Sequence, residues 1–242
     1  MIFSSFNNRL PDPTFGLNEA GALDGSGYRG PGFAEVSIAS NSPTQVSRTI
    51  SGRGVHRATG AHEWSINITY HPMLRDDFDV VSSFLEARDG RLNPFYVVVP
   101  QHSKPKDPVF ASFVATNPMV VDGAHLAGDS TLMIDAGSQI LGSAKFGDYF
   151  NIVDPANVNH KKTYKVVRVE TNTTYQVDSV QPRTDQLRLH IKPPLTKATS
   201  SGAAIKWINP EFRVIPSGYV IEYKLGTDNL YQFQLNLEEI LP

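Results

Sequence analysis

The chain of 242 residues contains no cysteine. Disulfide bonds, iron–sulfur clusters, thiolate zinc sites and cysteine nucleophiles are therefore excluded. Long apolar runs are missing as well, because the longest, such as residues 96–100, fall far short of the roughly 20 residues that a membrane-spanning helix needs. The first ten residues lack the basic segment and apolar stretch of a signal peptide. The sequence thus predicts a soluble protein made without export machinery, and no membrane partner.

Strong charge of either sign is absent too. The formal net charge is -2, and hydrophobic residues make up 40% of the chain. This composition predicts packed cores rather than disorder. It also disfavours a dedicated nucleic-acid-binding protein, which would carry a strongly basic surface.

The sequence shows none of the usual catalytic or metal-binding motifs. Its seven histidines form no H-E-x-x-H pattern, and G-x-S-x-G and phosphate-binding loops are missing. The adjacent carboxylates Asp76–Asp77 and Glu238–Glu239 do not face each other on a helix or a strand. We therefore expect no catalytic, cofactor-binding or metal-binding residues, no cofactor and no enzymatic activity.

The first part of the chain reads as a β domain with one helix. Residues 10–32 are rich in Gly, Pro, Asp and Asn, which predicts either a free linker or an arm that docks on a neighbouring subunit. A β pattern begins at residue 33, and apolar and polar residues alternate over 62–70, as in a strand covered on one face. Apolar residues at helical spacing predict a helix over 74–85 that ends at Asp89-Gly90.

The remaining pattern is almost entirely β. Strands are predicted at 95–100 and 109–115, and a weaker one at 44–50. Between 117 and 209, short apolar runs separated by turn residues predict a small closed barrel. The runs are 132–134, 149–153, 164–169, 175–180, 187–191 and 205–208.

The end of the chain predicts a β-hairpin around residues 226–229. Such a hairpin needs the earlier strands as pairing partners. We therefore predict a mainly β protein in which residues 1–116 plus 210–242 form one domain with a flanking helix. Residues 117–209 form the barrel inserted into it.

Aromatic and basic residues are interleaved in the barrel segment, as in barrels that bind oligonucleotides or oligosaccharides. The aromatic candidates for such a ligand surface are Tyr149, Tyr164, Tyr175 and Trp207. Basic residues lie near them in the sequence: Lys161, Lys162, Lys165 and Arg168. The alternative, which we favour, is that the aromatic rings fill the barrel core and the lysines lie in solvent.

Several segments resemble the distal tail proteins of long-tailed phages. They are Ala61-His-Glu-Trp-Ser-Ile-Asn-Ile-Thr-Tyr-His-Pro, Ser83-Phe-Leu-Glu-Ala-Arg-Asp-Gly-Arg and Asn93-Pro-Phe-Tyr-Val-Val-Val-Pro-Gln. The same segments are similar to the lambda-type minor tail protein M. The opening residues 9–13 and 31–36, with 145–152, 163–166 and 189–195, resemble distal tail proteins that carry an inserted oligonucleotide/oligosaccharide-binding (OB-fold) barrel.

The resemblance implies a tail-tube-like β domain and an OB-like barrel that points outward. It implies a structural protein of the virion, made in the host cytoplasm and located at the distal end of the tail. Six copies would form a ring (a homohexamer) that joins the tail tube protein to the baseplate hub or tip protein and leaves a channel for DNA. Side tail fibres are a further expected partner. Two alternatives remain open: a glycan- or receptor-binding module acting through the barrel, and a tube or baseplate hub component of a contractile tail.

The polar faces of strands 62–70 and 229–238 are the candidate channel lining. Their side chains are uncharged and form hydrogen bonds: Ser65, Asn67, Thr69, Gln232, Gln234 and Asn236. Such a surface could line a wet channel along which DNA slides without adhering.

Overall fold

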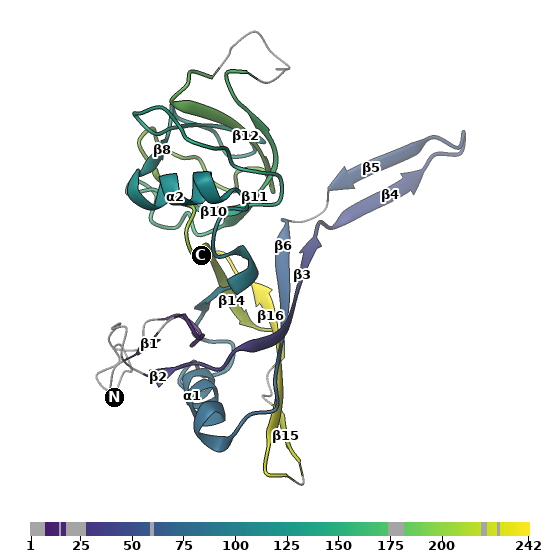
Figure 1. Cartoon of the computed structure of the whole chain (residues 1–242). Coiled ribbons are helices and arrows are strands. Elements are labelled where there is room, and N and C mark those ends of the chain that lie inside the picture. Colours follow the sequence, from purple (N-terminus) through teal and green to yellow (C-terminus); the bar gives the residue numbers. More distant parts are fainter. Residues whose placement is uncertain are drawn as a thin grey trace. The chain divides into compact units, whose positions relative to one another are not determined.

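The computed structural model describes residues 8–14, 16–17, 28–58, 61–173, 182–218, 222–226 and 228–242. The fold is mainly β, as predicted, and Figure 1 shows its strands and two α-helices. The chain forms two compact units. One comprises residues 1–97 and 213–240, and the other comprises residues 98–212 and 241–242.

The first unit is built on a sheet with the strand order β3-β6-β16-β14-β7. Strand β15 pairs with β16 outside this path and forms the predicted hairpin with it. The sheet strands are β3 (Phe33–Asn41), β6 (Glu63–Tyr70), β7 (Phe95–Val98), β14 (Glu211–Pro216), β15 (Tyr223–Leu225) and β16 (Tyr231–Glu239). Because β14, β15 and β16 pair within the sheet of the early strands, the two ends of the sequence build one sheet.

Helix α1 (Arg75–Glu86) covers the apolar face of this sheet. Phe78 stacks on Tyr231 with ring centroids 4.5 Å apart, and Phe84 meets Phe95 edge-on at 5.4 Å. Asp89 and Gly90 adopt positive φ after the last turn, as expected for residues that end a helix. The helix predicted over 74–85 is therefore confirmed.

Residues 9–12 are packed into the first unit. Leu10 is buried, and its backbone N–H donates to the carbonyl of Tyr96 at 2.8 Å. The Arg9 guanidinium forms an ion pair with the buried carboxylate of Asp12. A free linker is therefore wrong for these residues. Further on, the short strands β1 (Gly16–Leu17) and β2 (Tyr28–Arg29) pair with each other.

A separate two-stranded hairpin lies between β3 and β6 in the sequence. It consists of β4 (Thr44–Arg48) and β5 (Gly54–Ala58), which pair only with each other among the described strands. The predicted strand over 44–50 corresponds to β4, whereas β5 was not predicted. Figure 1 shows this hairpin extending from the ends of β3 and β6.

The second unit contains a closed six-stranded barrel with the strand order β10-β11-β12-β9-β8-β13. Its strands are β8 (Met119–Val121), β9 (Thr131–Asp135), β10 (Tyr149–Val153), β11 (Thr163–Glu170), β12 (Gln186–Lys192) and β13 (Ala204–Lys206). Leu132, Phe150 and Leu189 are fully buried inside it. The predicted strand at 175–180 lies outside the described residues.

The strand predicted over 109–115 is wrong, because this segment is helix α2 (Pro108–Thr116). The Asp107 carboxylate accepts hydrogen bonds from the backbone N–H groups of Val109 and Phe110, and Pro108 occupies the first turn. The short 3-10 helix η1 (Pro100–His102) precedes it. Helices η1 and α2 lie in the second unit, which therefore includes residues 98–116 that were predicted to belong to the first domain.

Candidate functional site

The six predicted channel-lining residues lie on one face of the sheet. In the antiparallel register of β6 and β16, Asn67 is opposite Asn236 and Thr69 is opposite Gln234. Ser65 is opposite Glu238, and Gln232 continues the row beyond Gln234. Residues opposite each other in an antiparallel pair point to the same side. The structure therefore brings all six together into one surface, which we call the polar face.

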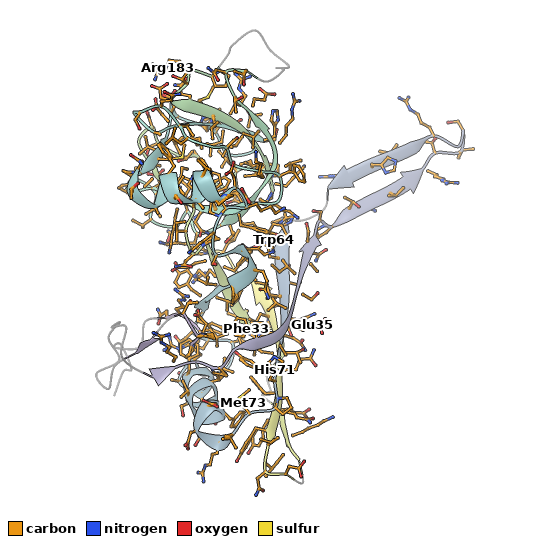
Figure 2. All side chains as sticks on the ribbon, viewed as in Figure 1. Phe33, Glu35, Trp64, His71, Met73 and Arg183 are labelled. Carbon is orange, nitrogen blue, oxygen red and sulfur yellow. The ribbon has the colours of Figure 1, made fainter. Side chains whose placement is uncertain are left out.

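Strand β3 extends the polar face by one more row. Glu35 is opposite Thr69, Ser37 is opposite Asn67, and Ala39 is opposite Ser65. Figure 2 labels Glu35 on β3 and Trp64 on the adjacent β6, where Trp64 belongs to the buried, opposite face. The contribution of β3 was not predicted, because the sequence alone does not show which strand pairs with β6.

Carboxylates are the main charged groups of the polar face. Besides Glu35 and Glu238 it includes Glu63, which is opposite Asn41 on β3. Arg91 forms an ion pair with Glu238, and Lys224 on β15 is opposite Gln232. The surface therefore combines amides, hydroxyls and carboxylates, with few cations.

A groove near β15 is lined by residues from both faces of the sheet. Its volume is about 870 Å³, and its lining residues are Thr69, Tyr70, Pro72, Glu222, Tyr223, Lys224, Gln232, Phe233, Gln234 and Asn236. Four of the six predicted residues line it. The lining offers hydrogen-bonding groups but no constellation of a nucleophile with a base.

The opposite face of the same strands forms the core. Trp64, Ile66, Ile68 and Tyr70 are all buried, and so are Phe233, Leu235 and Leu237 on β16. The strict alternation of buried and exposed side chains fixes the register, since a slip by one residue would expose the apolar row. Burial raises the pKa of the Tyr70 hydroxyl, and the nearby Asp12 carboxylate raises it further.

The aromatic residues considered as a ligand surface of the barrel are not exposed. Tyr164 and Trp207 lie within its hydrophobic core, and Tyr149 is also buried. Burial raises the pKa of Tyr149, and its ring lies under the ammonium group of Lys165 at 5.5 Å. Tyr175 lies outside the described residues. The three described rings fill the interior, so their faces are not available for stacking on a base or a sugar.

Two buried polar groups of the barrel were not foreseen. Lys162, which the sequence places in solvent, is fully buried. His160 is also buried, and its Nε2 lies 2.7 Å from the Tyr164 hydroxyl. Burial lowers the pKa of His160, although the carboxylate of Asp154 raises it.

A third unforeseen group is Glu170, at the end of β11. Its carboxylate is fully buried and lies within 3.5 Å of Arg168, Arg188 and His190. In register, Glu170 is opposite Arg188, while Arg168 is opposite His190. Only the pairing of β11 with β12 brings these charges together, so the sequence offered no signal for the cluster.

Within the described ranges, no group of three or more His, Cys, Asp or Glu residues could hold a metal ion. The described helices are all too short or too polar to cross a bilayer.

The comparisons with known proteins add no further constraint. No protein-family model matches the chain, and a search of curated proteins also found no match.

Proposed function

We propose that the chain is a structural subunit of a phage tail tip, of the distal tail protein type. Six copies would form a ring between the tail tube and the baseplate hub or tip protein. The ring would leave a channel for DNA, and the barrel would be an accessory module on it. In this role the protein needs a shaped surface and stable interfaces, and no catalytic group.

The observation that carries the proposal is the composition of the polar face. Across β3, β6 and β16 it presents hydroxyls, amides and carboxylates in register. Binding of DNA is dominated by contacts between phosphates and Lys or Arg, which release counterions. A surface poor in cations and rich in neutral hydrogen-bonding groups remains hydrated and gives phosphates little to bind. Such a lining lets DNA pass without adhering.

The edges of the sheet support assembly into a ring. At one edge, residues 8–10 cover β7, with hydrogen bonds from Leu10 N–H to the Tyr96 carbonyl and from Tyr96 N–H to the Asn8 carbonyl. At the other edge, no strand among the described residues pairs with the outer side of β3. An open edge of nine residues would promote aggregation unless a partner covers it. A ring of identical subunits provides that partner without leaving free ends.

The alternative that the barrel is a glycan-binding module is not favoured, because Tyr149, Tyr164 and Trp207 are buried. The test of the proposal is the state of assembly of the purified chain. Light scattering coupled to size-exclusion chromatography should give six times the mass of the 26.7 kDa chain. Negative-stain electron microscopy should show rings with a central hole. A chain that stays monomeric at millimolar concentration contradicts the proposal.

A further inference from the structure

The hairpin β4–β5, residues 44–58, has no partner among the described residues of its own unit. All five residues of β4 are exposed. Among its apolar side chains, Val46 is 59% exposed, Val55 is 51% exposed, and Ile50 at the turn is completely exposed. A single two-stranded hairpin is marginally stable in water. We call this segment the hairpin arm, and its exposed valines and isoleucine indicate that something else covers it.

The hairpin arm is basic, whereas the rest of its unit is acidic. The arm contains Arg48, Arg53 and Arg57, all exposed, and no acidic residue. Residues 1–97 and 213–240 together contain ten Lys and Arg against fourteen Asp and Glu. Since three of the ten cations are in the arm, the remainder of the unit has seven cations against fourteen acids. The arm is thus complementary in charge to the body that carries it.

An acidic and partly apolar surface lies at the other end of the same sheet. It consists of Leu74, Asp76, Asp77, Asp79, Tyr223 and Leu225, which we call the acceptor end. Two exposed cations lie among them: Arg75, which forms an ion pair with Asp79 at 3.3 Å, and Lys224 on β15. Leu74 is 64% exposed, Tyr223 is 53% exposed and Leu225 is 55% exposed. The first turn of α1 lies beside the β15–β16 hairpin. The ring centroids of Phe78 and Tyr223 are 4.8 Å apart, and Met73 forms an antiparallel β-bridge with Tyr231.

The hairpin arm lies away from the acceptor end of its own chain. The arm precedes the first residue of β6, Glu63, and the acceptor end follows the last, Tyr70. A strand of eight residues separates the two by about 27 Å. Figure 1 shows β4 and β5 at one end of β6, with α1 and β15 at the other.

We propose that the hairpin arm of one copy docks on the acceptor end of the next copy. Arginines of the arm meet Asp76 and Asp77, and Ile50 at the turn packs together with the valine of the docked face on Leu74, Tyr223 and Leu225. A second copy fits better than DNA, because the arm exposes Val46 on one face and Val55 on the other, and phosphates do not bury valine. Both surfaces therefore lose exposed apolar area in the same contact.

This contact is head-to-tail, because the two surfaces differ and lie at opposite ends of one unit. Head-to-tail contacts close into rings when the rotation between neighbours divides a full turn. The inference rests on the proposed ring for its biological meaning and names the segments that hold neighbouring subunits together. Because the contact is partly ionic, it weakens as salt concentration rises.

The test uses charge reversal in the full chain. Each of R48E/R57E and D76K/D77K should weaken assembly at least about tenfold in apparent dissociation constant, measured by sedimentation equilibrium. The combined variant, which exchanges the charges of arm and acceptor, should assemble again. So should an equimolar mixture of the two variants. K104E/K192E is the matched control, since it reverses two exposed lysines of the other unit and should assemble normally. Circular dichroism and thermal unfolding verify that each variant is folded.

The outcomes distinguish this inference from the proposed function. Rings that form in R48E/R57E as readily as in the unmodified chain overturn the docking inference and leave the ring intact. Loss of assembly in both variants without recovery on mixing also overturns it, because the acceptor would then be elsewhere. A chain that forms no assembly overturns the ring and the docking contact together.

Discussion

Asn67 on β6 lies directly opposite Asn236 on β16, and both side chains are exposed on the same face of the sheet. One residue further along each strand, Ile68 and Leu235 are opposite each other and buried. Two strands separated by more than 150 residues in the sequence thus contribute matched rows to a polar surface and to a core.

Lysines in the polar face should convert it into a surface that holds DNA. The variant N67K/N236K adds two neighbouring cations where the proposed channel has amides. Each cation can neutralise a phosphate, so the assembled ring should retain duplex DNA in low salt and release it as salt rises. Fluorescence anisotropy with labelled duplex measures the binding constant at several salt concentrations. The slope of its logarithm against the logarithm of salt concentration gives the number of phosphates contacted.

The matched control is Q139K/A198K, which adds the same charge at two exposed positions of the barrel unit. It should change retention of DNA far less. Equal retention of DNA by both variants would mean that the net charge of the chain alone determines DNA binding. That result would contradict a special role of the polar face.

The two faces of β6 should respond differently to truncation. Ile68→Ala removes a fully buried side chain and should lower the free energy of unfolding by about 2–5 kcal/mol. Asn67→Ala, the adjacent exposed residue, should change it by less than about 0.5 kcal/mol. Urea denaturation followed by tryptophan fluorescence measures both. A large loss in Asn67→Ala would show that the amide makes contacts that stabilise the isolated subunit.

The alternation of apolar and polar residues along 62–70 was sufficient to predict this strand and its two faces, because a period of two is typical of a strand buried on one side. The helix of the first unit was equally readable from its apolar spacing and its Asp89-Gly90 ending. Segment 109–115 was misread, since a short apolar run fits a strand or a buried helix. The deciding features were the Asp107 cap and Pro108, which precede the run.

The parts that sequence could not predict depend on register or on three-dimensional closure. Glu35 belongs to the polar face only because β3 pairs with β6. The burial of Tyr164 and Trp207 follows from closure of the barrel, which turns one side of each strand inward. An interleaved aromatic and basic sequence is compatible with both a core and a ligand surface, and only closure distinguishes them.

The buried carboxylate of Glu170 should be important for the stability of the barrel. Glu170→Gln removes the negative charge that lies against the guanidinium groups of Arg168 and Arg188, and so breaks both ion pairs. Breaking a buried ion pair costs about 3 kcal/mol or more, and the partial exposure of Arg168 places this case near the lower end. Thermal unfolding should show a clear decrease, and Glu86→Gln on the exposed side of α1 provides a neutral reference. A change in Glu170→Gln no larger than that reference would contradict the expectation.

Acidification should destabilise the barrel through His160. Burial lowers the pKa of His160 below its usual value of 6.5 in the folded chain. As pH falls below about 6.5, the unfolded chain takes up a proton that the folded chain does not, so stability decreases until the lowered pKa is reached. Burial and the nearby Lys165 and Lys106 also lower the pKa of His102, which adds to the same trend.

The contribution of His160 can be separated with His160→Gln, which keeps a hydrogen-bonding group near the Tyr164 hydroxyl. Between pH 7.5 and 5.5 this variant should lose less stability than the unmodified chain in urea titrations. An identical pH dependence in both proteins would show that His160 does not titrate as described.

The central claim is that the polar face of β3, β6 and β16 lines the channel of a ring. A cryo-electron microscopy map of the assembled chain tests it most directly. The account predicts six-fold symmetry, with Asn67 and Asn236 of every subunit facing the central axis. A ring in which these two side chains face outward, or are buried between subunits, would contradict it.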